Sequence, residues 1–388
     1  MTSRPAILKN GPAVYHHVAD IARCTPVAHV LLHGDLPAWL LTRPEDVIAA
    51  ARDPRFTSDD RTLGSSGRSS VKFGFMSMDG PEHVRLRRMV TSVFTPRHVA
   101  ELRPYIERVV NELIDVIVPA GRADLVADLA LVLPMRVICE LLGVPFDERE
   151  QFEDTANAML RPAVGGGAHP RAARANLYGY LTDLVGRKRQ RPGEDLLSKL
   201  AASPNLTKQE VVETCALLLV AGYETTTDLI GTSILALITH QEQLRLVRSG
   251  ATLPNAVDEL IRYCGPVAVG VTRYTSQTVT VAGTSIPPGA RVILGLGAAN
   301  RDATRFPFPR RLDVTRVSTS HFGFGQGPHY CLGAPLARLE TEVALSAVLN
   351  RLDDLALGGT PSWSSSIFHG LSRLPVVFRS SAGRAAVR

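Results

Sequence analysis

The sequence predicts a mainly helical protein with small β-sheets, an α+β fold in one domain over residues 1–388. Apolar residues recur every three or four positions over about 81–265 and 333–352, as in helices that pack on a core. Over about 25–60 and 267–296 they alternate, which is typical of short strands. No internal repeat or linker separates these segments, so one core is expected to join them.

The first part of the chain is expected to be rich in strands. Apolar runs at 29–33 and 38–41 flank a Gly-Asp pair, which is a hairpin turn signal. Pro44 then opens a short helix from a first-turn position. The polar segment 58–70 contains many Ser, Gly and Arg residues, and we expect it to form a loop that lines a binding site.

The middle of the chain is expected to be helical. A glycine-rich stretch at 161–167 interrupts the pattern and predicts a flexible lid between two helices. The longest helix begins at a capping box, with Thr207 as N-cap and Glu210 reaching back to it. Its periodicity continues to about His240, roughly 50 Å of helix. Since it is apolar on most sides, we expect it to be buried.

The charge and cysteine content exclude several classes of protein. The net charge is +6, and the basic residues are scattered, which argues against a nucleic-acid-binding stripe and leaves room for a basic patch that meets an acidic partner. The five cysteines form no C-x-x-C pair, which argues against zinc sites and disulfide frameworks. Without a signal peptide or a membrane-length apolar run, a cytoplasmic protein that binds no membrane is expected.

One cysteine lies in an unusual setting. Cys331 follows Gly327 and precedes Gly333, directly before the last long helix. Glycines let backbone N–H groups approach the sulfur closely, and a helix N-terminus favours a thiolate. A thiolate in such a loop is suited to be an axial metal ligand.

This segment resembles the haem-binding loop of cytochromes P-450, whose pattern is F-x-x-G-x-x-x-C-x-G. Phe324, Gly327, Cys331 and Gly333 match it. A merely buried cysteine at a helix start would not require the Phe and both glycines. The resemblance implies heme b, with Cys331 as iron ligand and with the haem between the long central helix and the cysteine-bearing helix. Gln326 departs from the family, where His or an aromatic residue is frequent.

A second matching motif lies in the middle of the long helix. Ala221, Gly222, Glu224 and Thr225 fit the family's A-G-x-[DE]-T. Gly and Thr are poor formers of a buried helix, and a Thr hydroxyl can bond a backbone carbonyl and distort the turn. The resemblance implies that Glu224 and Thr225 assist proton delivery, while Ala221 and Gly222 leave room for oxygen.

Further matches concern the fold behind the haem and the haem carboxylates. Glu259 and Arg262 fit E-x-x-R, whose i,i+3 spacing allows pairing on one helix face. Arg311 is expected to be the third, structural member, with Arg310 as the alternative. By resemblance, four residues are expected to bind the haem and its carboxylates: His83, Arg87, Arg273 and His329.

The resemblance therefore implies a monooxygenase that inserts one atom of O2 into a small, largely apolar organic substrate, in secondary-metabolite biosynthesis. Electrons would pass from NAD(P)H through a ferredoxin reductase and a ferredoxin, which would dock on a basic face with Arg85, Arg88 and Arg338. A monomer is expected. Candidate substrate-pocket residues are mostly apolar: Phe75, Leu218, Val267, Val269, Ile367 and Phe368.

Three alternatives stay open at this point. The same fold could catalyse oxidative coupling or peroxide-driven oxidation, although the intact Glu224-Thr225 pair argues against this. A non-enzymatic haem-based gas sensor or carrier would not need that pair. A helical interaction protein without haem would leave the cysteine segment unexplained.

Overall fold

The computed structural model describes residues 6–7, 13–32, 36–60, 74–160, 170–249, 253–317, 320–364 and 368–380. The predicted fold class is confirmed, because helices dominate and the strands form small sheets. The predicted lid at 161–167 and most of the predicted loop at 58–70 lie outside the described residues.

The largest sheet has six strands in the order β1-β2-β3-β9-β6-β4. The predicted hairpin is confirmed, since β2 and β3 pair antiparallel with Val27 opposite Leu41. β3 pairs parallel with β9, from the second predicted strand region, so residues about 250 positions apart share one sheet. The strands are β1 (Ala6–Ile7), β2 (Val27–Leu32), β3 (Leu36–Leu41), β4 (Phe56–Thr57), β6 (Val271–Thr275) and β9 (Arg291–Leu294).

Three smaller sheets complete the strands. One has the order β10-β13-β5, and the other two are the pairs β11-β12 and β7-β8. Their strands are β5 (Arg122–Asp124), β7 (Val279–Val281), β8 (Thr284–Ile286), β10 (Leu352–Leu357), β11 (Ser362–Trp363), β12 (Leu371–Arg373) and β13 (Pro375–Ser380).

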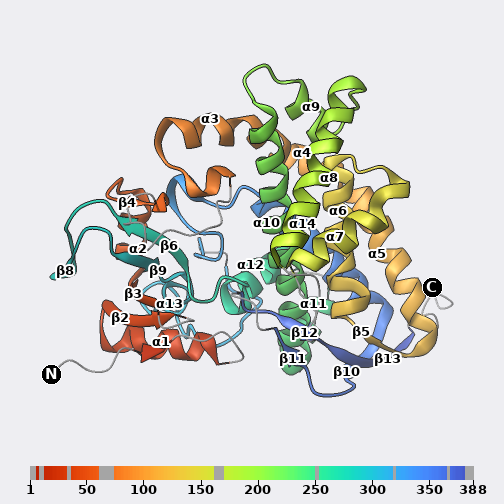
Figure 1. Cartoon of the computed structure of the whole chain (residues 1–388). Coiled ribbons are helices and arrows are strands. Elements are labelled where there is room, and N and C mark those ends of the chain that lie inside the picture. The colour runs from red at the N-terminus through yellow and green to blue at the C-terminus, as the bar shows by residue number, and fades with distance from the viewer. Residues whose placement is uncertain are drawn as a thin grey trace.

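The helices form the larger part of the molecule, on the opposite side from the six-stranded sheet and its helices α1 and α2 (Figure 1). None of the helices among the described residues has the length and hydropathy needed to cross a membrane. The α-helices are α1 (Val14–Cys24), α2 (Pro44–Arg52), α3 (Gly80–Thr91), α4 (Pro96–Glu101), α5 (Arg103–Ile117), α6 (Val132–Leu142), α7 (Arg149–Leu160), α8 (Pro170–Gln190), α9 (Leu196–Ala202), α10 (Lys208–Thr239), α11 (Gln241–Arg248), α12 (Leu253–Cys264), α13 (Leu296–Ala299) and α14 (Ala334–Arg351).

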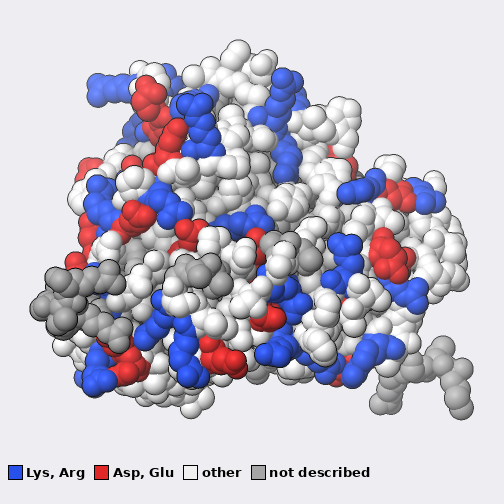
Figure 2. Space-filling model, turned by 180° about the vertical axis from the view of Figure 1, so that it is seen from behind, with Lys and Arg blue, Asp and Glu red and all other residues white. Residues whose placement is uncertain are grey.

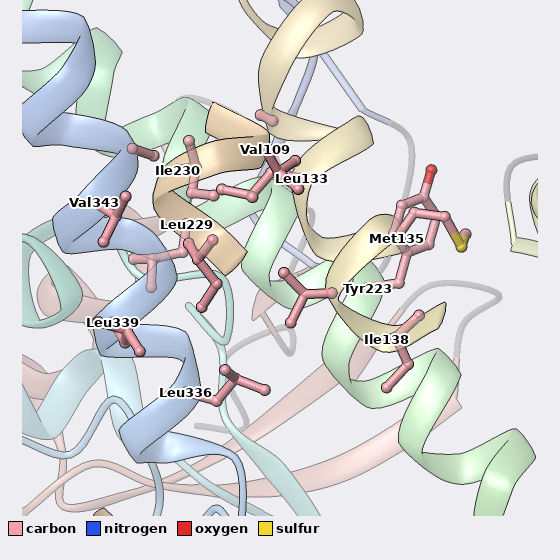
Figure 3. Close-up of a cluster of buried hydrophobic side chains, with 14 of the residues drawn as sticks. Val109, Leu133, Met135, Ile138, Tyr223, Leu229, Ile230, Leu336, Leu339 and Val343 are labelled. Atoms are coloured by element: carbon pink, nitrogen blue, oxygen red, sulfur yellow. The ribbon is translucent and has the colours of Figure 1, made fainter. Parts of the chain in front are cut away.

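Helix α10 is the predicted long helix, with 32 residues. The capping box is confirmed: Glu210 N donates to Thr207 Oγ1 at 3.2 Å, and Thr207 N donates to Glu210 Oε2 at 2.8 Å. The helix runs through the core and packs against α6, α8, α12 and α14. Figure 3 shows Leu229 and Ile230 of α10 next to side chains from α14, including Val343. This packing holds α10 beside the helix that follows Cys331.

Candidate functional site

The loop before α14 is closed on itself around Cys331. The backbone N–H of Cys331 donates to the carbonyl of Phe324 at 2.8 Å. Gly327 has φ +72°, and a Cβ there would overlap the carbonyl oxygen of Ala51 on α2, so no larger residue fits. The loop therefore has a shape that depends on this glycine.

The sulfur of Cys331 lies at the start of α14, as predicted. Burial raises the pKa of the Cys331 thiol, while the backbone N–H groups of Gly333 and Ala334 and the charge of Arg87 oppose the rise. Burial outweighs these favourable groups in the protein alone, whereas a bound metal cation would stabilise the thiolate directly. The donor set of this loop therefore fits a metal-ligating sulfur.

Four residues predicted to bind haem carboxylates come together from separate elements. His83 and Arg87 lie one turn apart on α3, and the His83 ring stacks on His329 with centroids 4.2 Å apart. Arg87 donates to the carbonyl of Tyr330, beside Cys331. Arg273 on β6 is buried, and its charge acts on His83. Four nitrogen-bearing side chains thus lie around one site.

This cluster fits a negatively charged group. Burial, together with the charges of His329 and Arg87, lowers the pKa of His83 to about 4. Among the described residues, His83 Nε2 is buried and has no hydrogen-bond partner. A buried polar nitrogen without a partner is costly, and with its proton on Nε2 the His83 ring would donate to a carboxylate of haem.

Asp79 is a site residue that the sequence reasoning missed. Its carboxylate accepts from Thr57 Oγ1 at 2.5 Å and from Ser58 N at 2.6 Å, and it lies 2.8 Å from His329 Nε2. Although burial acts to raise it, these hydrogen bonds hold the pKa of Asp79 well below its usual value. The ionised carboxylate orients the His329 ring. The signal available was its place as the N-cap residue before Gly80-Pro81.

The motif in α10 forms a distinct turn. Ala221 is exposed and Gly222 and Thr225 are half-buried, whereas Tyr223 and Glu224 between them are buried. Thr225 Oγ1 donates to the carbonyl of Ala221 at 2.6 Å, which confirms the predicted carbonyl bond. Glu224 is 8% exposed. Small residues thus open the face of the helix on which the hydroxyl lies, while Glu224 is buried.

The E-x-x-R pair is confirmed as a buried, bidentate ion pair. Arg262 Nε and Nη2 donate to Glu259 at 2.7 and 2.8 Å, and both side chains are 1% exposed. The predicted third member is wrong. Arg311 is exposed and offers only its carbonyl to Arg262, whereas Arg316 Nε donates to Glu259 Oε2 at 3.0 Å.

A second ion-paired contact ties α12 to the cysteine loop. Arg338 Nε donates to Asp258 Oδ1 at 2.7 Å, and its guanidinium carbon lies 4.5 Å from the Phe324 ring centroid. Despite burial, which raises it, hydrogen bonds from His321 and Arg338 lower the pKa of Asp258 to about 2. A cation–π contact thus joins Phe324 of the loop to Arg338 of α14.

The predicted pocket residues lie in several environments. Phe75 and Leu218 are buried in the helical core, and Val267 and Val269 pack against the sheet-side clusters. Phe368 is half-buried, and Ile367 lies outside the described residues. Their contact with a substrate stays a prediction.

Comparison with known proteins decides the family. A family profile described as Cytochrome P450 matches residues 251–375. Cytochrome P450 107B1 of Saccharopolyspora erythraea is 39% identical over 376 residues, which cover 90% of this chain and 92% of that protein. The chain belongs to the cytochrome P450 family. Other relatives of this cytochrome P450 include the Mycinamicin IV hydroxylase/epoxidase of Micromonospora griseorubida, 40% identical over 92% of this chain and 94% of that protein.

Solved structures agree with the fold of this cytochrome P450. The bacillaene polyketide synthase cytochrome P450 PksS of Bacillus subtilis superimposes with a TM-score of 0.88 at 34% identity, over 94% of this chain and 96% of that chain. The protein is therefore a haem-dependent monooxygenase, an oxidoreductase that uses heme b. Bound haem-thiolate supplies the oxygen chemistry, and the protein supplies ligand, protons and substrate placement.

Proposed function

We propose that this cytochrome P450 binds heme b through Cys331 and oxidises a small, largely apolar compound of secondary metabolism with one atom of O2. The observation that carries the proposal is the closed loop at Cys331, in which Gly327 excludes a Cβ and backbone N–H groups approach the sulfur. The substrate class follows from the apolar candidate pocket residues and from the names of relatives that act on mycinamicin IV or belong to a polyketide synthase.

Each site residue has a proposed role. His83, Arg87, Arg273 and His329 hold the haem carboxylates, because cationic and N–H donors gather there around an unpartnered His83 nitrogen. Phe324 and Gly333 shape the loop around the ligand.

The α10 turn is proposed to serve oxygen and protons. Ala221 and Gly222 leave space for O2 on the open face. Thr225 holds a hydroxyl on that face, and Glu224 exchanges protons with it from the buried side. An acid next to an alcohol in a water-poor site can move a proton inward without opening the site to bulk solvent.

The electron donor is proposed to be an acidic ferredoxin, itself reduced from NAD(P)H by a ferredoxin reductase. Of the three arginines predicted to dock it, Arg85 is paired with Glu210, and Arg338 is bound to Asp258. Arg88 is exposed and makes no ion pair among the described residues. It lines a groove of about 730 Å³ with Val84 and Met89. Arg88 is thus the arginine of this set best placed to meet an acidic partner.

The charges on the face drawn in Figure 2 are dispersed. Figure 2 shows Lys and Arg interleaved with Asp and Glu over the face seen there, in place of one basic stripe. This argues against the binding of nucleic acid, and a monomer that acts on small molecules is proposed. A cytoplasmic location is proposed with it.

The spectrum of the reduced, CO-bound protein tests the proposal. A strongly red-shifted Soret band is expected, because a thiolate ligand donates electron density to iron. The band should be lost in Cys331→Ser and kept in the matched control Cys24→Ser, whose cysteine is exposed at the end of α1. A globin-like band in the unmodified protein would contradict thiolate ligation, and the absence of haem would contradict the whole assignment.

A further inference from the structure

A buried hydrogen bond joins α10 to α7 directly beside the Glu224-Thr225 pair. Tyr223 lies between Gly222 and Glu224 and is 1% exposed to solvent. Its hydroxyl donates to Asn157 Oδ1 at 2.6 Å. Asn157 lies in the last turn of α7, 66 residues earlier in the chain. The bond therefore links α7 and α10 directly before the Glu224-Thr225 pair.

The surroundings of this bond are apolar. Figure 3 shows Tyr223 beside Met135 and Ile138 of α6. Ile138 also lies against Gly222, 3.9 Å from where a Cβ would be. On α7 the inward residues are Phe152 and Ala156, both fully buried. A phenol buried among such groups needs a partner for its hydroxyl, so the Asn157 oxygen sets where the end of the Tyr223 side chain lies.

The turn that carries Tyr223 can respond to this restraint. Thr225 Oγ1 competes for the carbonyl of Ala221, which ordinarily accepts only the backbone bond of the helix. Bonds of this kind weaken and bend a helix locally. A small displacement of Tyr223 would therefore move the following two residues, Glu224 and Thr225, relative to the rest of α10.

We propose that Tyr223 is a positioning residue whose hydrogen bond to Asn157 keeps the Glu224-Thr225 turn in register with α7. This inference rests on the proposed function, in which Glu224 and Thr225 deliver protons. While the bond is intact, the hydroxyl and the carboxyl keep their relative places. When it is lost, the turn relaxes and proton delivery becomes less efficient.

The consequence can be read from the fate of O2. With efficient proton delivery and no oxidised substrate, one O2 takes four electrons and four protons from two NADPH and two protons of the solvent, and two waters form. With poor delivery, one O2 takes two electrons and two protons from one NADPH and one solvent proton, and H2O2 is released. The ratio of H2O2 formed to NADPH oxidised therefore reports the proton delivery and needs no identified substrate.

The experiment measures this ratio for the haem-loaded protein with a purified [2Fe–2S] ferredoxin, its reductase and NADPH. In Tyr223→Phe the ring remains and only the hydroxyl is lost. We expect the ratio to rise because the partition of O2 between H2O2 and water shifts about threefold toward H2O2, as for the loss of one buried hydrogen bond. Asn157→Leu should raise it equally, and the double variant no further, because both remove the same bond. Asn157→Asp keeps an oxygen acceptor for the Tyr223 hydroxyl, so the ratio should stay at the value of the unmodified protein.

Two further variants decide between the possible failures. Tyr180→Phe is the matched control, since Tyr180 donates to Glu148 at 2.7 Å from α8, and it should leave the ratio unchanged. Unchanged ratios in both Tyr223→Phe and Asn157→Leu, with a raised ratio in Thr225→Ala, would overturn the positioning role alone. An unchanged ratio in Thr225→Ala as well would overturn the proton-delivery role on which it rests. A rise that is additive in the double variant would also contradict a shared bond.

Discussion

The correction from Arg311 to Arg316 predicts different stabilities for two arginine-to-alanine variants. Arg316→Ala removes a hydrogen bond to the buried Glu259 carboxylate at 3.0 Å and another to the carbonyl of Pro307 at 3.0 Å. Arg262 still pairs with Glu259, so the carboxylate does not become an isolated buried charge. The bond to Pro307 is exposed, so water replaces it at little cost. The loss should therefore be mainly that of one hydrogen bond to a charged group, about 2.5 kcal/mol.

The same reasoning gives a small effect for Arg311→Ala. The Arg311 side chain is exposed, and the network uses only its backbone carbonyl, which alanine retains. The change in unfolding free energy should stay within about 0.5 kcal/mol. Arg311→Ala is thus a matched control that removes an arginine five residues away.

Thermal unfolding of the two haem-loaded variants measures the difference. At about 2.1 cal/mol/K per residue, 388 residues give an unfolding entropy of roughly 0.8 kcal/mol/K. Arg316→Ala should then lower Tm by about 3 °C, and Arg311→Ala by less than about 1 °C. Equal losses in the two variants, or a larger loss in Arg311→Ala, would refute the assignment of Arg316 as the third member of the network.

Three other outcomes are expected. Arg88→Gln should slow reduction by ferredoxin about threefold at low salt, measured by stopped flow with Arg311→Gln as control, and the effect should disappear at high salt. Equal rates in Arg88→Gln and the unmodified protein at low salt would contradict docking at Arg88. In the haem-free protein, burial and nearby charges lower the pKa of His83 from 6.5 to about 4. The unfolded chain therefore binds a proton below pH 6.5 that the folded chain does not. The contribution of His83 to the free energy of unfolding should be fully present above pH 6.5 and be lost as the pH falls toward 4. In urea titrations, His83→Gln should flatten the pH dependence of the free energy of unfolding. An unchanged pH dependence would contradict the lowered pKa of His83. Gly327→Ala should displace the loop from Ala51 and lower the haem content per protein; full haem loading would show that the loop tolerates a Cβ.

Local chemistry made several site residues predictable. Thr225 bonds the carbonyl of Ala221 because both partners lie four residues apart on one helix, so spacing alone places them together. The same holds for Glu259 and Arg262, which are separated by three residues. For Thr207 and Glu210 the residue types and the spacing specify the cap.

Residues that meet through loops could not be assigned in this way. Arg316 and Arg311 follow the same irregular segment, and nothing in their spacing says which side chain turns inward toward Glu259. Asp79 meets His329 250 positions later, and Tyr223 meets Asn157 66 positions earlier. Such pairs depend on how whole elements pack, because the path of the chain between the partners is not periodic.

By itself, the sequence determined the α+β class, the long capped helix, the hairpin and the cysteine loop, since each depends on interactions within a few residues or on a residue pattern shared with the cytochrome P450 family. Only the tertiary structure decided which arginine completes the buried network, which carboxylate orients His329, and which helix restrains the turn next to Glu224. The physical reason is that the burial and the partner of a polar side chain are set by distant elements that pack around it, and these fix its energy far more than its neighbours in the chain do.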